Sequence, residues 1–231
     1  MRSIIKYSIS VCLIFFAAAT HGQQKKAPKP KKDFMPTGFR VGTDLIDLGK
    51  TITSHTFTGW EVNGDVDFAN YYMTVDVGTW GKDILIKNGD YKNAGTYYRA
   101  GIDVNFLGTD PDKNMFFIGF RVGHSVFNES VSYRTTPTYL FYPLDTTSLN
   151  PSATGHWGEL TTGLRVKVWK GLWLGYTARM KFAPTVHGSP GFATYDMPGY
   201  GVIHSSPWWG FNYQVFWRFA WRKDKVLPEK K

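Results

Sequence analysis

The stretch from Trp209 to Arg222 constrains the fold more than any other part of this sequence. Every second residue in it is apolar or aromatic, and the residues between them are mostly small or polar. The apolar set is Trp209, Phe211, Tyr213, Val215, Trp217, Phe219 and Trp221. A period of two predicts a β-strand whose two faces meet different surroundings. A tilted strand needs about 9–11 residues to cross a bilayer, so this segment is long enough to span a membrane. The alternative is a long, half-buried strand of a soluble sandwich.

Residues 1–22 have the pattern of a secretory signal peptide. Two basic residues precede the apolar run Val11–Ala19, and small residues then offer a cleavage point after Ala19 or, as we prefer, after Gly22. The only cysteine, Cys12, lies within this run. We therefore expect an exported mature chain without disulfides or cysteine ligands, as in a bacterial envelope protein.

Residues 23–34 (QQKKAPKPKKDF) are basic, contain prolines and show no apolar pattern. We expect a solvated periplasmic tail; an arm that contacts an acidic partner or lipid headgroups is the alternative. The whole chain carries a formal charge of +9, but its charges alternate with apolar residues instead of clustering on a helix. Nucleic acid is therefore not an expected partner.

Seven further segments alternate like the last one. They are residues 38–45, 60–68, 71–78, 98–106, 115–126, 159–168 and 172–182. The predicted connections between the eight strands alternate between long and short. The long ones are residues 47–57, 81–94, 127–157 and 183–207.

This sorting of connections is typical of bacterial outer-membrane barrels. The predicted fold class is therefore all-β: an eight-stranded antiparallel up-and-down transmembrane β-barrel over residues 35–222. Short turns and both termini would be periplasmic, the long loops would be extracellular, and residues 223–231 would form a C-terminal periplasmic tail.

The residues predicted to face the inside of this barrel include many charges. They are Arg40, Asp44, Glu61, Asp65, Asp67, Asp76, Arg99, Asp103, Arg121, Glu159, Arg165, Lys167, Arg179, Lys181, Arg218 and Arg222. The interior of an eight-stranded barrel is just wide enough for side chains to fill, and unpaired buried charges are costly. We therefore expect a plugged, ion-paired interior in place of a diffusion pore.

Two short runs carry a resemblance to a known family. Residues 38–44 (GFRVGTD) and 59–64 (GWEVNG) resemble a Bacteroidota family catalogued as a domain of unknown function. Over about residues 35–222 the strand pattern is also similar to small OmpA-like and PorT-like outer-membrane barrels. Such barrels usually end on an aromatic residue; here Trp221 or Phe219 would take that place, ahead of a basic tail.

Some eight-stranded outer-membrane barrels are enzymes that act on lipid A or acyl chains, so histidines near acids and hydroxyls are candidate sites. Two groups lie near the predicted outer rim: His124, Ser125 and Glu129, and His156 and Glu159. Adjacent residues on a strand point to opposite faces, so His124 and Ser125 cannot readily meet. The remaining candidates, in the long loops, are His55, His187 and His204, and no ligand spacing supports a metal. We assign no catalytic, cofactor-binding or metal-binding residue and expect no cofactor.

Three functions remain open for a protein expected in the bacterial outer membrane, in contact with its lipids and lipopolysaccharide. The first is a non-enzymatic structural or accessory subunit of an envelope complex. The second is a surface binder or adhesin acting through its long loops, including the aromatic run Tyr139–Tyr142. The third is a lipid-modifying hydrolase that uses His124 or His156.

Overall fold

The computed structural model describes residues 34–108, 110–135 and 144–222. The predicted signal peptide (1–22), nearly all of the basic tail (23–34), the C-terminal tail (223–231) and the run Tyr139–Tyr142 lie outside the described residues.

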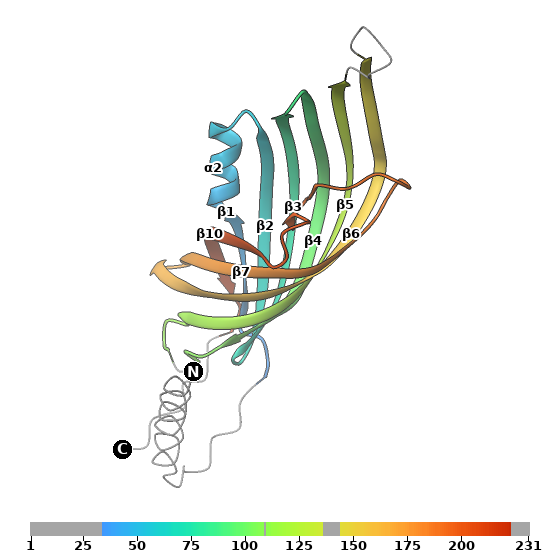
Figure 1. Cartoon of the computed structure of the whole chain (residues 1–231). Coiled ribbons are helices and arrows are strands. Elements are labelled where there is room, and N and C mark those ends of the chain that lie inside the picture. Colours follow the sequence, from blue (N-terminus) through green and yellow to red (C-terminus); the bar gives the residue numbers. More distant parts are fainter. Residues whose placement is uncertain (1–33, 109, 136–143, 223–231) are drawn as a thin grey trace, which may run out of the picture. The chain divides into compact units, whose positions relative to one another are not determined.

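Eight antiparallel strands form a closed ring (Figure 1). They are β1 (Gly38–Asp44), β2 (Phe57–Phe68), β3 (Tyr71–Ile86), β4 (Gly89–Asn105), β5 (Met115–Thr135), β6 (Leu144–Trp169), β7 (Leu172–His187) and β10 (Trp208–Ala220). Consecutive strands pair with each other, and β1 closes the ring by pairing with both β2 and β10. The prediction of an all-β chain with eight antiparallel strands is confirmed.

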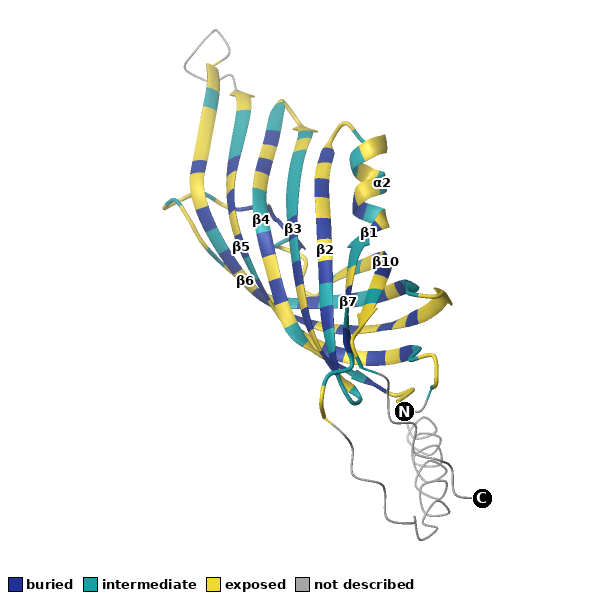
Figure 2. Cartoon of the chain, turned by 180° about the vertical axis from the view of Figure 1, so that it is seen from behind, coloured by how far each residue is buried: buried dark blue, intermediate teal, exposed yellow. Residues whose placement is uncertain are grey.

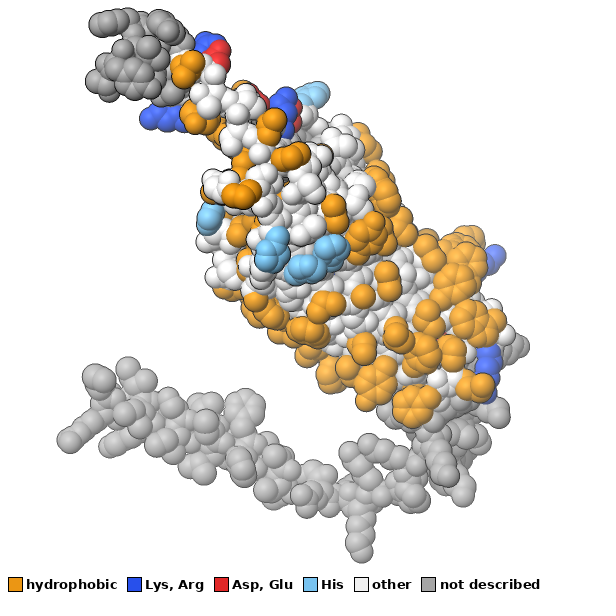
Figure 3. All heavy atoms as spheres, turned by 90° about the vertical axis from the view of Figure 1, so that its right-hand side faces the viewer, with side chains coloured by type: hydrophobic (Ala, Val, Ile, Leu, Met, Phe, Trp, Pro, Cys, Tyr) orange, Lys and Arg blue, Asp and Glu red, His pale blue; other side chains and the backbone are white. Residues whose placement is uncertain are grey.

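The alternation in the sequence sorts side chains between the inside and the outside of the ring. Buried and exposed residues follow one another along β2 to β6 as bands (Figure 2). On β10, Trp209, Phe211 and Trp217 are exposed, whereas Asn212 and Gln214 are buried. Figure 3 shows hydrophobic side chains covering the outside of the ring on the face in view. The polar face of each strand therefore points inward.

The prediction of loops at residues 81–94 and 127–157 is wrong, because β3 to β6 continue through most of these segments as paired strands. A tight turn at Lys87 and Asn88 joins β3 to β4, and Asn88 has a φ of 66°, a conformation that Asn tolerates well. The predicted alternation of long and short connections therefore fails here. Residues 83–93, 128–135 and 144–153 form what we call the raised sheet, which rises above the ring (Figure 1). Its sequence lacks the apolar–polar period that marks the strands of the ring.

A helix, α2 (Leu45–Thr53), occupies much of the predicted break at residues 47–57. Asp44 caps it by accepting a hydrogen bond from the backbone N–H of Ile46 at 3.0 Å, as N-cap carboxylates do. The Thr51 hydroxyl joins the helix to β2, donating to the Gly59 carbonyl at 2.6 Å and accepting from the Gly59 N–H at 2.7 Å. The helix thus stands above the end of the short strand β1 (Figure 1).

The connection from β7 to β10, predicted as an open loop over residues 183–207, folds inward. β7 extends to His187, and residues 188–207, which we call the inner hairpin, contain β8 (Asp196–Met197) paired with β9 (Gly201–Val202). Residues 196–201 are all buried. Among the described residues, no helix is both long and apolar enough to cross a bilayer.

Candidate functional site

The centre of the ring is filled by charged side chains that form ion pairs across it. Asp76, on β3, accepts from Arg121 at 2.5 Å, and its Oδ2 lies 3.3 Å from Arg99 Nε and 3.4 Å from Arg179 NH1. These arginines lie on β4, β5 and β7, so one carboxylate connects opposite walls. Glu61 and Glu159 complete this layer: Glu61 pairs with Arg99, and Glu159 accepts from Arg179 at 3.1 Å.

A second layer lies nearer the β2–β3 turn, at Asp65 of β2 and Asp103 of β4. Asp65 lies between two guanidinium groups, 2.9 Å from Arg40 and 2.6 Å from Arg165. Asp103 accepts from Arg165 at 3.2 Å and from Arg121 at 2.9 Å, which links the two layers. A buried carboxylate is tolerated in an apolar surround when paired and hydrogen-bonded in this way.

The lower end of the ring is closed by Asp67. Its carboxylate accepts from Lys113 at 2.8 Å, from Arg218 at 2.9 Å and from the backbone N–H groups of Thr37 and Gly38 at 2.7 and 3.0 Å. Charged and backbone donors from separate segments thus meet at one carboxylate.

Three of the predicted inward charges lie at the lower end of the ring and are less buried than the others. Lys167 is exposed and pairs with Asp112 of the β4–β5 turn at 2.7 Å. Lys167 keeps the parity of Arg165 and lies opposite the buried Trp173 in the β6–β7 register; it is exposed because it lies near the end of β6, beside the β6–β7 turn. Arg218 and Arg222, at the lower end, are only partly buried.

The inner hairpin is held at the upper end of the ring by a buried carboxylate, Asp196. It accepts from Lys82 Nζ at 2.5 Å, from Trp80 Nε1 at 3.1 Å and from Asn93 Nδ2 at 3.0 Å. The three donors come from the upper parts of β3 and β4. The donors for the hairpin therefore lie at the upper rim of the ring, where β3 and β4 continue into the raised sheet.

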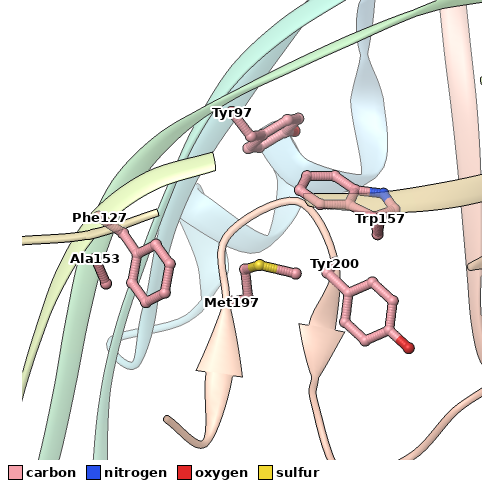
Figure 4. Close-up of a cluster of buried hydrophobic side chains, with 6 residues drawn as sticks. All are labelled: Tyr97, Phe127, Ala153, Trp157, Met197 and Tyr200. Carbon is pink, nitrogen blue, oxygen red and sulfur yellow. The ribbon is translucent and has the colours of Figure 1, made fainter. Parts of the chain in front are cut away.

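Apolar packing supports the same arrangement. Met197 and Tyr200 of the hairpin lie among side chains of the ring wall (Figure 4). The wall residues of this cluster are Tyr97, Phe127, Ala153 and Trp157. Lys181, on β7, donates to the carbonyls of Gly199 and Tyr200 at 2.7 and 3.1 Å. The hairpin thus fills the upper mouth of the ring.

The raised sheet contributes further polar contacts to the hairpin. The Tyr91 hydroxyl donates to Glu129 at 2.9 Å and accepts from the Asp196 N–H at 3.2 Å, and Glu129 also accepts from Thr194 and, at 2.9 Å, from Asn150. Burial first, and then the charge of Glu129, raise the pKa of Tyr91 above its ordinary value. Tyr91 is therefore held as a neutral hydrogen-bond donor.

The histidines near the rim do not meet the hydroxyl and acids expected beside them. His124 and His156 lie opposite each other on the outside of β5 and β6, with ring centroids 4.6 Å apart. Ser125 is fully buried on the inside, as are Glu129 and Glu159. The described residues thus contain no arrangement of a serine, a histidine and an acid at this position. Figure 3 shows a group of histidine side chains at the upper margin of the apolar surface.

The loop histidines are exposed. His187 and His204 line a surface pocket of about 460 Å³ between the top of β7 and the inner hairpin, and His55 follows α2. Within the described ranges, no group of three or more His, Cys, Asp or Glu side chains could hold a metal ion.

The sequence patterns do not predict the residues that hold the inner hairpin. Tyr91 and Asn93 fall in the loop predicted at residues 81–94, although they continue the alternation of Tyr97 and Arg99 at positions of the same parity. This shared parity could have predicted that Tyr91 and Asn93 face the same side of β4 as Tyr97 and Arg99. Asp196 had no such signal, because its partners Lys82 and Asn93 lie more than a hundred residues away.

The chain is a closed ring of eight antiparallel strands with an ion-paired interior and an apolar outer surface. Its class of β-protein is thus the reverse of the usual one, in which the core is apolar and the surface polar. The chain belongs to a family described as a domain of unknown function, DUF6048, whose model matches residues 4–222. A search of curated proteins finds no match to the chain.

Proposed function

We propose that this chain is an outer-membrane β-barrel of the OmpA-like or PorT-like type, with a closed lumen and a non-enzymatic role as a structural or accessory subunit of an envelope complex. The observation that carries the proposal is the reversal of polarity. Buried side chains of the ring include five interior arginines, while exposed positions hold large apolar residues. The arginines are Arg40, Arg99, Arg121, Arg165 and Arg179.

The outer surface supports a bilayer as its surrounding. Soluble monomers rarely expose apolar patches larger than a few hundred Å², whereas this ring is apolar outside on all its strands. Aromatic side chains lie toward both ends of this surface, as Trp209 and Trp217 do on β10 and Tyr98 and Phe106 around β4. Two aromatic girdles around an apolar band are typical of transmembrane barrels.

The interior supports a closed barrel. The ion-paired layers around Asp76 and Asp65, with the inner hairpin above them, leave the space between the walls occupied by side chains. A protein of this kind acts through its surfaces: the lipid-facing wall, the periplasmic end and the raised sheet, which would stand outside the cell. Its partners would be outer-membrane lipids, lipopolysaccharide and envelope proteins.

The barrel is tested by fractionation and by a gel in which samples are either boiled or left unheated. We expect the protein in the outer-membrane fraction, with an unheated band that migrates differently from the boiled one. A protein found in a soluble fraction, with no heat-dependent shift, would contradict the proposal.

The accessory role is tested by purification from native outer membranes in mild detergent. A stoichiometric partner, identified by mass spectrometry, is the expected result. A barrel that purifies alone would favour the second candidate, a surface binder. That candidate has its own support in the raised sheet, which extends a preformed β-surface beyond the ring.

A further inference from the structure

We propose that the free edge of β6 in the raised sheet, Leu144–Leu149, binds an extended and uncharged segment of a partner protein as an additional β-strand. This inference rests on the proposed function, since it takes the raised sheet to stand outside the outer membrane. Strand addition to a sheet edge gives affinity through main-chain hydrogen bonds, so the edge itself specifies an extended backbone as its ligand.

The edge is open on one side over its whole length. β6 pairs with β5 from Leu144 downward, but its pairing with β7 begins only at Thr154. Within the described ranges, no strand pairs with the other side of Leu144–Leu149. Below it, the Asn150 side chain accepts from the Ser189 N–H at 2.8 Å, and Pro151 lacks an N–H, so the open segment ends there.

The opposite edge of the raised sheet is protected in ways that β6 is not. On β3, the Asp83 N–H donates to the Thr56 carbonyl at 3.0 Å, so only Ile84–Ile86 is unpaired on that side. Asp83 also pairs with Lys92 at 2.9 Å. Proteins block exposed edges by shortness and by charge. Both edges carry one exposed ion pair, so shortness is what distinguishes β3 from β6. β6 has a longer open segment without lysine or proline.

Side chains along the edge indicate the chemistry of the added strand. The only charge in the segment, Asp145, already pairs with Arg134 of β5 at 2.6 Å, so it does not call for a basic partner. Thr147 contacts Ser132 at 3.2 Å, and Leu149 is 62% exposed. A strand placed beside them would set apolar or β-branched residues next to Leu149 and a hydroxyl next to Thr147.

A second copy of the chain fits this edge poorly. Two copies in one membrane have the same orientation, so their β6 strands rise in the same direction. A two-fold axis along the membrane normal would bring like edges together at equal height, with N–H groups facing N–H groups. Regular parallel pairing needs an offset between the strands, and the symmetry does not supply it. A different protein has no such restriction.

The test compares residue-resolved hydrogen exchange of the edge in native outer-membrane vesicles and in the purified protein in detergent. A paired strand protects only those amides that point to the new neighbour, and amides alternate along a strand. We therefore expect exchange at every second residue of 144–149 to slow by about tenfold or more in vesicles. The remaining amides, which point to β5, should be slow in both samples.

Matched variants link this pattern to the edge. The double variant Thr147→Lys/Leu149→Lys adds charge beside the incoming strand and should abolish the difference between vesicles and purified protein. Leu85→Lys, a similarly exposed position on the protected strand β3, should leave it unchanged. Both variants should show the heat-dependent gel shift of the parent, which verifies that the ring is folded.

Three results would overturn the proposal. Equal, fast exchange in vesicles and detergent would mean that the edge is unoccupied, while a heat-modifiable protein in the outer membrane would leave the proposed function intact. Protection that survives purification of a dimer would assign the edge to a second copy. Absence of the protein from the outer-membrane fraction would remove the proposed function and this inference together.

Discussion

Asp196 shows how a single residue holds a long connection in place. Its side chain has no exposed surface, and three donors from β3 and β4 satisfy it. A buried carboxylate would be strongly destabilising without these donors. The carboxylate therefore selects one position of the inner hairpin, where its donors converge.

We predict that Asp196→Asn loosens the inner hairpin without unfolding the ring. The amide keeps the shape of the side chain but places N–H groups against Lys82, which should lower the local stability of the hairpin by about 1–3 kcal/mol. Faster hydrogen exchange across residues 188–207, with an unchanged gel shift, would be the result. Asp145→Asn, at an exposed ion pair, is the control and should leave exchange across residues 188–207 unchanged. Unchanged exchange in the first variant would contradict the assigned role of Asp196.

At the scale of elements, the sequence predicts the strands of the ring but not what lies above them. The alternation along β10 is regular because its inward face lies against the charged interior and its outward face is apolar. In the raised sheet the alternation is weaker and apolar residues are fewer. Its Gly, Asn and Asp residues therefore led to the prediction of loops where the structure has strands. Backbone pairing does not need that contrast, and β3 to β6 continue regardless.

The sequence analysis predicted neither α2 nor the inner hairpin, and only α2 could have been predicted from local sequence. α2 carries a helical signal, with Leu45, Leu48 and Ile52 spaced along one face behind Asp44 as N-cap. The inner hairpin carries no local signal, because contacts with distant strands determine where it lies. A sequence pattern reflects the immediate surroundings of its own segment. It can therefore predict α2, whose structure is determined locally, but not the inner hairpin, whose position is determined by distant strands.

We predict that Asp44→Ala frays α2 and weakens its attachment to the wall. The substitution removes the cap on Ile46 and the acceptors used by Asn212 and the Tyr213 N–H. Loss of an N-cap costs about 0.5–2 kcal/mol, so exchange of the α2 amides should rise by about tenfold. Thr53→Ala, at the exposed end of the same helix, should have little effect. Equal exchange in both variants would show that Asp44 does not hold the helix.

At the scale of the whole molecule, the interior is a connected set of ion pairs that joins opposite walls. Asp76 alone reaches arginines of three strands. Alternation placed these charges inside and their signs suggested pairing, but which partners meet depends on the stagger of the strands. That stagger is not readable from single segments.

We predict that Asp76→Asn strongly destabilises the ring. It leaves Arg99, Arg121 and Arg179 close together without the charge they share, and breaking a buried pair in this way costs about 3–5 kcal/mol. The expected result is a lower urea midpoint for loss of the unheated band. The variant Asp112→Asn, at an exposed ion pair with Lys167, should leave the midpoint within the scatter of the parent. A parental midpoint for Asp76→Asn would count against a cooperative interior.

We also predict that the reconstituted protein forms no steady ion channel in a planar bilayer. Replacing residues 189–206 with a short Gly-Ser linker should not open one, because the paired layers around Asp76 and Asp65 lie below the inner hairpin. Conductance recordings of both proteins provide the measurement. A stable, ohmic conductance in either would contradict the closed lumen.

The strand that closes the ring is also the shortest one in it. β1 has 7 residues, whereas β5, which lies across the ring from it, has 21. The pairing of β1 with β10 joins the first and last strands of the ring, which are the farthest apart along the chain. Closing such a distant contact costs the most chain entropy, so we expect this seam to form last when the chain folds. The pairings of β1 with β10 and with β2 have the shortest registers in the ring, so we expect the ring to part first along β1 under mechanical or thermal load.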